Sequence, residues 1–204
     1  AFGFSTTDET HMMKNMEWGA VTYLSHSKYG INKEIAINSQ NAYTTGCGPQ
    51  SEGTISSGYI CNAYNTTLGQ SASATGNVYG VYDMNGGAIE YMMGNMVDSS
   101  GAFYSSKAYF NIPPAAKYYD KYSYTNFGSY WLGKLGDATK EMEPERYSWY
   151  FDNNDFPYNK SPWFVRGGSY TFEYDGSGGA FGFLCADGYG SVGTSARAVI
   201  SNLN

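Results

Sequence analysis

Apolar side chains recur at roughly helical spacing near the N-terminus, which predicts a first helix. Thr6 is a suitable N-cap, because the side chain of Glu9 can bond back to the backbone at the helix start. Tyr29 and Gly30 end the pattern, so we expect the helix to run from about residue 8 to about residue 27. The apolar positions are Met12, Met13, Met16, Ala20 and Leu24, with Trp18 beside them.

Strand-like patterns lie later in the chain. An apolar run at residues 88–93 follows a turn signal at residues 85–87, and it predicts a buried strand. Residues 163–170 begin as a strand, and residues 195–200 return to a strand that ends the fold. Residues 34–37 alternate briefly and fit a short strand or a second short helix.

The remaining stretches are rich in turn-forming residues. Residues 98–162 carry many tyrosines, and prolines punctuate them, which is typical of ordered loops. Short helical turns are expected at residues 117–121 and at residues 135–141, the second capped by Asp137. Nothing repeats and no linker divides the chain, so we predict a single α+β domain over residues 1–204.

Composition narrows the classes of partner. Charged residues are scarce at 15%, aromatic residues reach 18%, and a net charge of −6 argues against nucleic acid. Loop-rich extracellular proteins often have this composition, because tyrosine combines contact area with a polar tip. No run approaches the roughly 18 apolar residues that span a bilayer, so we expect no membrane contact. The chain starts without Met, and we interpret it as a piece whose targeting segment lies upstream.

Three cysteines are an odd number. Cys47 and Cys61 flank a loop of small polar residues, and a disulfide closing that loop is expected; the alternative is two unpaired thiols. Cys185 is then a free cysteine, either a small buried side chain or a reactive thiol. Zinc fits the sequence poorly, since His11 and His26 lie far from any paired cysteines.

Glu90 is unusual because it lies within an apolar strand pattern. A buried carboxylate needs a partner, and Arg166 or Arg197 could supply one and so hold two strands in register. The alternative is an acid for glycoside chemistry. That reaction requires a second placed carboxylate, which the sequence does not single out.

Two further groups could be imagined as sites. Residues 152–155 resemble an oxygen-rich loop for a structural Ca²⁺ ion, but they lack the glycine and terminal glutamate of an EF-hand. The alternative for these residues is a polar turn. His11, His26 and Glu17 are interpreted as a solvated face of the first helix.

Three blocks resemble the formylglycine-generating-enzyme (sulfatase-modifying factor) branch of the C-type-lectin-like fold. Residues 16–20 resemble its "EAEWEYAA" helix, and residues 79–91 resemble its "FGLYDMxGNVWEW" signature. Residues 166–170 and 195–197 resemble its "RGGSW … GFR" ending. Residues 87–89 and Ala196 depart from these patterns. The resemblance implies small mixed or antiparallel sheets, one long N-terminal helix and extensive ordered loops. The positions that it implies to be structural are Trp18, Asp83, Glu90, Arg166 and Arg197.

A narrower resemblance rests on residues 13–30 and 75–84. These stretches resemble surface proteins of gut Firmicutes and their phages, some of them prepilin-associated and some variable proteins of diversity-generating retroelements. The resemblance implies an extracellular location on a cell, pilus or phage surface. It also implies that variable positions lie between Arg166 and Arg197, within a candidate variable segment at residues 163–200.

We predict a binding surface in this last segment. Phe181 and Phe183 share a face that is expected to be core, so Leu184 should point outward. Residues 186–191 have the polar and aromatic composition of antibody-like binding loops. The alternative is that these aromatics fill a small core. The predicted contact residues are Phe172, Glu173, Tyr174, Asp175, Leu184, Ala186, Asp187, Tyr189 and Ser191.

The sequence therefore favours non-catalytic recognition of a protein or glycan, by an adhesin or receptor-binding domain. A copper oxidase like the enzymes of this branch needs two neighbouring thiolates near the C-terminus, and only Cys185 lies there. Two histidines cannot supply a non-haem iron site, and no cofactor is expected. The structural alternative is a pilin-like or filament subunit, whose exposed tyrosines contact other copies.

Overall fold

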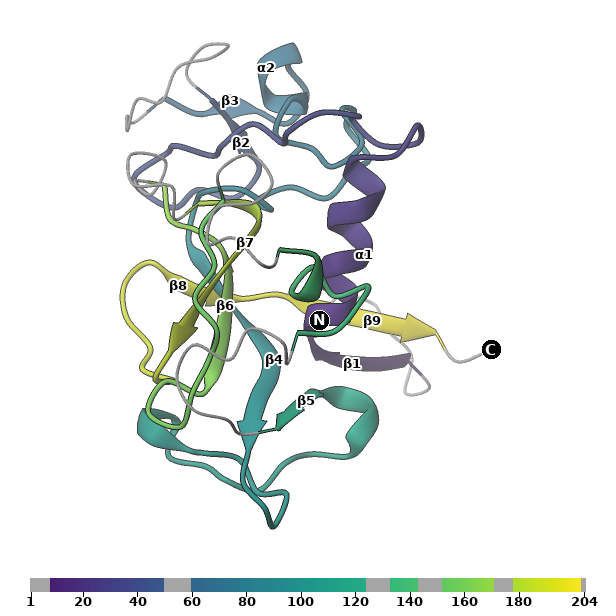
Figure 1. Ribbon diagram of the computed structural model, residues 1–204. Coiled ribbons are helices and arrows are strands. Elements are labelled where there is room, and N and C mark those ends of the chain that lie inside the picture. The colour runs from purple at the N-terminus through teal and green to yellow at the C-terminus, as the bar shows by residue number, and fades with distance from the viewer. Residues whose placement is uncertain (1–7, 50–59, 124–132, 143–151, 171–177, 203–204) are drawn as a thin grey trace.

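The computed structural model describes residues 8–49, 60–123, 133–142, 152–170 and 178–202 of the chain, which form an α+β structure. A mixed five-stranded sheet lies at the centre, with helix α1 (Asn15–Ser25) beside it, as Figure 1 shows. Two small antiparallel strand pairs lie outside this sheet. The predicted α+β class is confirmed.

Strand β4 (Ile89–Val97) is the centre of the sheet. Strand β6 (Trp163–Gly167) runs antiparallel along one edge, and β7 (Gly179–Ala186) pairs with β6 on its outer side. Two parallel strands share the other edge of β4, β8 (Thr194–Ala196) at its start and β5 (Asp120–Ser123) at its end. The last quarter of the chain therefore contributes strands on both sides of β4.

The two faces of β4 belong to two hydrophobic clusters. Met92 lies on the face that packs with Trp18 of α1, whereas Met93 packs against the second cluster on the opposite face. Phe181 and Phe183 on β7 are each 1% exposed and belong to the first cluster, as the alternation predicted. Burial of such large side chains is the main stabilising contribution to a domain of this size.

The long first helix was predicted wrongly. Residues 8–12 form strand β1 (Asp8–Met12), which pairs antiparallel with the last strand, β9 (Ala198–Asn202). The apolar spacing of these residues fits a helix, but their backbone N–H and C=O groups bond to β9 instead. Tertiary pairing therefore overrides the local helical preference. Helix α1 begins only at Asn15, where the Glu17 carboxylate accepts a hydrogen bond from Lys14 N at 2.9 Å.

The two histidines consequently do not share a helix. His11 lies in β1, and its Nε2 is 2.7 Å from Oε1 of Glu17 in an ion-pair geometry. His26 is the C-cap of α1, where its ring packs edge-on to Phe181 at 4.7 Å. The prediction of one solvated helix face is therefore wrong for His11, whose side chain is only 7% exposed.

The short elements follow the predictions in part. Residues 34–37 are neither strand nor helix; they run to an isolated bridge between Asn38 and Gly86. The turn expected at residues 117–121 is the 3₁₀ turn η2 (Ala116–Tyr118), followed at once by β5. The second expected turn is η4 (Lys140–Met142), and the predicted capping residue, Asp137, accepts from Thr139 N at 3.0 Å.

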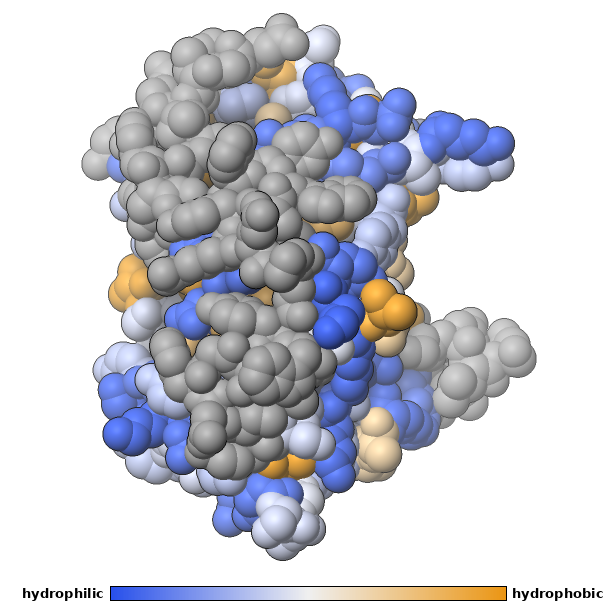
Figure 2. Space-filling model, in the orientation of Figure 1, coloured by the Kyte–Doolittle hydropathy of each residue, from blue (hydrophilic) through white to orange (hydrophobic). Residues whose placement is uncertain are grey.

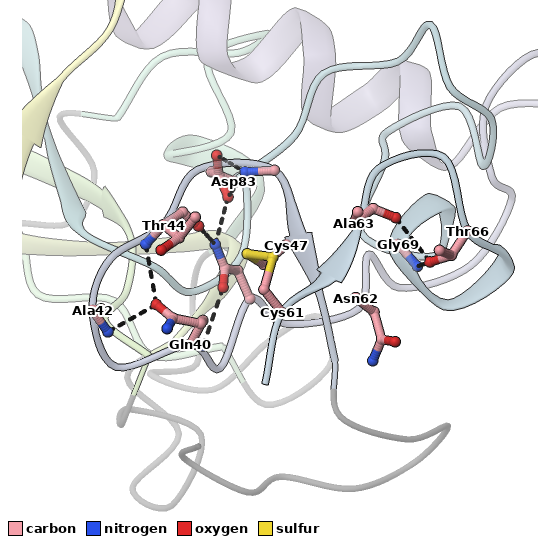
Figure 3. Close-up of a disulfide and its surroundings, with 12 residues drawn as sticks. Gln40, Ala42, Thr44, Cys47, Cys61, Asn62, Ala63, Thr66, Gly69 and Asp83 are labelled. Atoms are coloured by element: carbon pink, nitrogen blue, oxygen red, sulfur yellow. Dashed lines mark hydrogen bonds between the residues drawn. A yellow bond between two sulfur atoms is a disulfide. The ribbon is translucent and has the colours of Figure 1, made fainter. Parts of the chain in front are cut away.

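The predicted disulfide is present between Cys47 and Cys61. It links Cys47 in the short strand β2 (Cys47–Gly48) to Cys61, the residue before the short strand β3 (Asn62–Ala63), as Figure 3 shows. The short helix α2 (Thr67–Gln70) follows, capped by the hydroxyl of Thr66.

The described surface is mixed in character. In the view of Figure 2, hydrophobic residues appear as separate spots among hydrophilic ones. Among the residues described here, no helix has the length and apolar character required to cross a bilayer.

Candidate ligand-binding site

Arg197 and Glu90 form the floor of the candidate site. The Arg197 guanidinium donates from Nε to Glu90 Oε2 at 3.0 Å and from Nη2 to Oε1 at 2.5 Å. Burial raises the pKa of Glu90, and the neighbouring guanidinium opposes this by stabilising the carboxylate. Nη1 also donates to the carbonyl of Tyr82 at 2.9 Å, so one side chain ties the C-terminal segment to the loop before β4.

Arg166 has a different role, although it lies opposite Glu90 in the β4–β6 register. Its side chain is fully buried and points into the first core cluster, where Nε donates to Asn15 Oδ1 at 3.0 Å. Nη2 donates to the carbonyl of Asp137 at 2.7 Å, and Nη1 to that of Ala138 at 3.1 Å. Burial lowers the pKa of this guanidinium. The sequence offered Arg166 or Arg197 as the partner of Glu90, and in the structure that partner is Arg197.

A pocket of about 590 Å³ lies over the Arg197–Glu90 pair. Its walls come from three segments that are distant in sequence: residues 38–45, residues 81–90 and residues 193–197. Hydroxyl groups predominate among the exposed and half-buried polar side chains of its lining. The hydroxyl-bearing residues of the lining are Tyr43, Thr45, Tyr82, Thr194 and Ser195.

The first wall is a loop with its own hydrogen-bond network (Figure 3). Gln40 Oε1 accepts from Ala42 N at 2.8 Å and from Thr44 N at 3.2 Å, which fixes the loop around Tyr43. Asp83, whose φ of 60° lies in the left-handed region, binds the end of this loop by accepting from Gly46 N at 2.9 Å. The loop is therefore held by polar side chains that are themselves buried or half-buried.

The first and third walls meet at Tyr43 and Gly193. A Cβ atom at Gly193 would lie 2.6 Å from the Tyr43 hydroxyl, and the φ of Gly193 is +91°. Only glycine suits both the backbone conformation and the close approach. The Tyr43 ring also packs edge-on to Tyr170, with centroids 5.3 Å apart.

The predicted loop at residues 186–191 leads in sequence to Gly193, where the C-terminal part of the pocket lining begins, and it is anchored at several points. Asp187 forms an ion pair with Lys107, in which Oδ2 lies 2.7 Å from Nζ. The hydroxyl of Tyr91 donates to the carbonyl of Tyr189 at 3.0 Å, whereas the side chain of Tyr189 is 59% exposed. Ser191 is exposed, and its N–H donates to Thr194 Oγ1 at 2.8 Å.

The predicted contact residues divide into three groups. Phe172, Glu173, Tyr174 and Asp175 lie outside the described residues. Leu184 and Ala186 are on β7 and only half-buried, Leu184 opposite Val165 and Ala186 against the second hydrophobic cluster. The outward position expected for Leu184 is thus only partly realised. The exposed part of the predicted surface consists of Tyr189 and Ser191, next to half-buried Asp187.

Sequence reasoning missed the first wall of the pocket. Tyr43 and Thr45 lie in a stretch that was interpreted only as turn-rich, about 150 residues from the C-terminal segment. One signal that could have pointed to this wall is Asp83 in the block at residues 79–91, which the family resemblance implies to be structural. A buried aspartate needs donors, and they come from Asn38 and Gly46.

The polar stretch at residues 152–155 is tied to the sheet. Asp152 is 4% exposed and accepts from Phe181 N at 3.0 Å, and burial raises its pKa well above the ordinary value. Asp155 Oδ2 accepts from the Cys185 thiol at 3.3 Å. Burial, together with the Asp155 carboxylate, raises the pKa of Cys185 to about 12. Within the described ranges no cluster of three His, Cys, Asp or Glu side chains could hold a metal ion, and the Ca²⁺ hypothesis stays a prediction.

No protein-family model, curated protein or solved structure matches this chain.

Proposed function

We propose that this chain is a non-catalytic recognition domain that binds a protein or glycan ligand. Its contacts come from residues 187–196 and from the pocket that residues 193–197 help to line. One observation carries the proposal: Tyr189 is exposed on a loop whose backbone is fixed by Tyr91 and by the Lys107–Asp187 ion pair. A fixed loop with exposed side chains loses little conformational entropy on binding, which favours affinity.

The sequence resemblance supports this reading. We propose a C-type-lectin-like domain of the formylglycine-generating-enzyme branch, near the variable proteins of diversity-generating retroelements and prepilin-associated surface proteins. In that reading Trp18, Arg166 and the Arg197–Glu90 pair are the constant frame. The intervening loop then carries the variable contacts. A disulfide at Cys47–Cys61 is consistent with the extracellular, cell-surface, pilus or phage location that we propose.

The chemistry of the site favours binding over catalysis. Both oxygens of Glu90 accept hydrogen bonds from Arg197, so this acid is engaged as an ion-pair partner. A Cu(I) site needs a pair of thiolates, but Cys47 and Cys61 are joined to each other, which leaves Cys185 alone. The cysteines of this chain therefore do not fit the copper centre of the related oxidases.

The proposal can be tested with two defined probes, an array of glycans and a phage-displayed library of short random peptides. We expect reproducible binding to one of them, weakened about tenfold or more by Tyr189→Ser. Tyr29→Ser is the matched control, because Tyr29 is 72% exposed and lies beyond the C-terminal end of α1. Binding that responds equally to both substitutions would contradict a ligand site in this loop.

A filament subunit is the second candidate. Large side chains are also exposed away from the pocket walls, among them Tyr79 at 93% and Leu135 at 75%. Such side chains would be buried between copies in a filament. Sedimentation velocity over a range of protein concentrations separates the two candidates. A recognition domain should sediment as a monomer, whereas a filament subunit should form assemblies whose size grows with concentration.

A further inference from the structure

We infer that residues 106–112 form the second half of the binding surface, and that the partner is a protein segment with apolar side chains flanked by acidic ones. This inference rests on the proposed function and names its partner class. The short turn η1 (Ser106–Ala108) and the residues after it were interpreted from sequence only as ordered loop. The structure joins them to the C-terminal loop.

Lys107 makes this connection in three ways. Its backbone N–H donates to the carbonyl of Asp187 at 2.8 Å, and its Nζ lies 2.7 Å from Asp187 Oδ2. The same ammonium group lies 5.7 Å from the centre of the Tyr189 ring, within cation–π range. At Gly188 a Cβ atom would lie 2.6 Å from that of Ala108, so the two loops are in direct contact. They form one continuous surface.

Two residues of the segment 106–112 have an unusual backbone conformation. Ser106 has a φ of 43° and Tyr109 a φ of 60°, both in the left-handed region that costs energy for residues other than glycine. Phe110 anchors the segment by packing on Trp163 at 5.2 Å and on Phe103 at 6.1 Å. Strain of this kind persists where the surrounding structure enforces it, and it is frequent at binding sites. Here it presents Tyr109 with 89% of its surface exposed.

The exposed side chains indicate a protein partner. Tyr109 and Tyr189 could stack on a sugar or pack on a protein, but Val192, at 91% exposure, is aliphatic. An aliphatic side chain gains from burial against apolar groups, about 25 cal/mol per Å², and gains little from a hydroxylated ring. Val192 lies three residues after Tyr189 in the same loop, and exposed aromatic and aliphatic side chains together are characteristic of protein interfaces. The surface therefore suits apolar protein side chains better than a glycan.

Charge indicates what surrounds those apolar side chains. Lys107 belongs to this surface, and the backbone of Lys160 adjoins it, since the hydroxyl of Ser106 donates to the carbonyl of Lys160 at 2.8 Å. Asp187 offsets one of the two lysines, and Lys160 is exposed. With Asp187 counted against the two lysines, one positive charge remains beside this surface, on a chain whose net charge is −6. A partner with Asp or Glu around its apolar residues is complementary to it, and steering by opposite charge speeds association.

The test uses a phage-displayed library of short random peptides, selected against the disulfide-bonded chain. We expect the enriched peptides to combine aromatic or aliphatic residues with Asp or Glu. Tyr109→Ser should weaken a selected peptide about tenfold, and Lys160→Glu by a similar factor that shrinks at high salt. Tyr29→Ser should leave the affinity within about twofold. Thermal unfolding verifies that each variant is folded. If Tyr109→Ser is not folded, Tyr109→Gly replaces it, because glycine suits the left-handed backbone at this position.

Three outcomes would overturn the inference, and they differ in whether the proposed function still stands. If Tyr189→Ser weakens binding while Tyr109→Ser and Lys160→Glu do not, the composite surface is wrong and the proposed function stands. If the library yields only basic peptides or none, while a glycan binds in a Tyr189-dependent manner, the partner class is wrong. If substitutions in neither loop alter the binding of any probe, both proposals are wrong.

Discussion

Arg197 holds Glu90 through two nitrogens, one hydrogen bond to each carboxylate oxygen. The pair joins the residue between β8 and β9 to the central strand β4, and it forms the floor of the candidate binding pocket. The Glu90 side chain is 7% exposed and that of Arg197 22%. The interaction is therefore largely removed from solvent, where loss of one partner leaves an uncompensated charge.

Arg197→Met should lower the free energy of unfolding by about 3 kcal/mol, because it leaves the Glu90 carboxylate buried without its partner. Arg197→Lys retains the charge but not the two-pronged geometry, so an intermediate loss is expected. Urea unfolding followed by circular dichroism measures both. Lys28→Met, at an exposed lysine, is the control and should change stability by less than about 0.5 kcal/mol. Equal losses for Arg197→Met and Lys28→Met would show that the pair contributes nothing.

A glycine series separates crowding from backbone conformation. At Gly179 the φ is +106° and an added Cβ would lie 1.8 Å from Asp152 Oδ1, so Gly179→Ala should cost more than about 3 kcal/mol. Gly46 also has a positive φ, +74°, but open space around it, so Gly46→Ala should cost about 1 kcal/mol. Gly190→Ala should be nearly neutral. Thermal and urea unfolding give the order, and a reversed order for Gly179 and Gly46 would refute the close contact with Asp152.

Asp152 should make stability fall as the pH rises. Its pKa in the folded protein is raised by burial, so above about pH 4 the unfolded chain releases a proton that the folded chain retains. The free energy of unfolding then declines until the pH passes the raised pKa. Asp152→Asn should flatten this decline in urea unfolding measured from about pH 4 to about pH 7. Asp98→Asn is the opposite control, because hydrogen bonds from Ser100 lower the pKa of Asp98.

Reduction of the Cys47–Cys61 disulfide should destabilise the chain by about 3 kcal/mol, since the bond joins two cysteines 14 positions apart in sequence. The measurement compares urea unfolding with and without a reductant. A Cys47→Ser and Cys61→Ser double variant should match the reduced protein. If the reductant changes the wild type and the double variant alike, the effect comes from elsewhere.

Cys185 should react slowly with thiol reagents at neutral pH. With a pKa of about 12, almost none of the thiol is ionised, and the thiolate is the reactive form. Asp155→Asn removes a negative charge beside the sulfur and should speed the reaction without unfolding the protein. The rate of disulfide exchange with an aromatic disulfide reagent measures this. A native rate equal to that of a small free thiol would contradict the half-buried environment beside the Asp155 carboxylate.

The parts that could be predicted from sequence are those that depend on local pattern. The apolar run at residues 88–93, the strand at Trp163 and the shared core face of Phe181 and Phe183 follow from periodicity. The disulfide follows from two cysteines around a polar loop. Each of these is decided within a few neighbouring residues.

What could not be predicted depends on pairing between distant segments. Residues 8–12 have helical spacing but lie in a strand, because the partner strand β9 is at the other end of the chain. The same holds for the pocket, whose first wall at Tyr43 meets Gly193 across about 150 residues of sequence. Local spacing contains no information about such encounters. The link between Lys107 and Asp187 has the same cause.

The pairing of β1 with β9 has a mechanical consequence. Asp8 lies opposite Asn202, so the two ends of the described chain leave this antiparallel pair at the same end. A force pulling those ends apart would peel the strands open one residue pair at a time, which offers little resistance. A force that enters at the loop of Tyr189 and leaves through one end alone does not pull on the pair in that way. If the chain is displayed on a surface, as we propose, it should therefore withstand tension better when it is tethered through a single terminus.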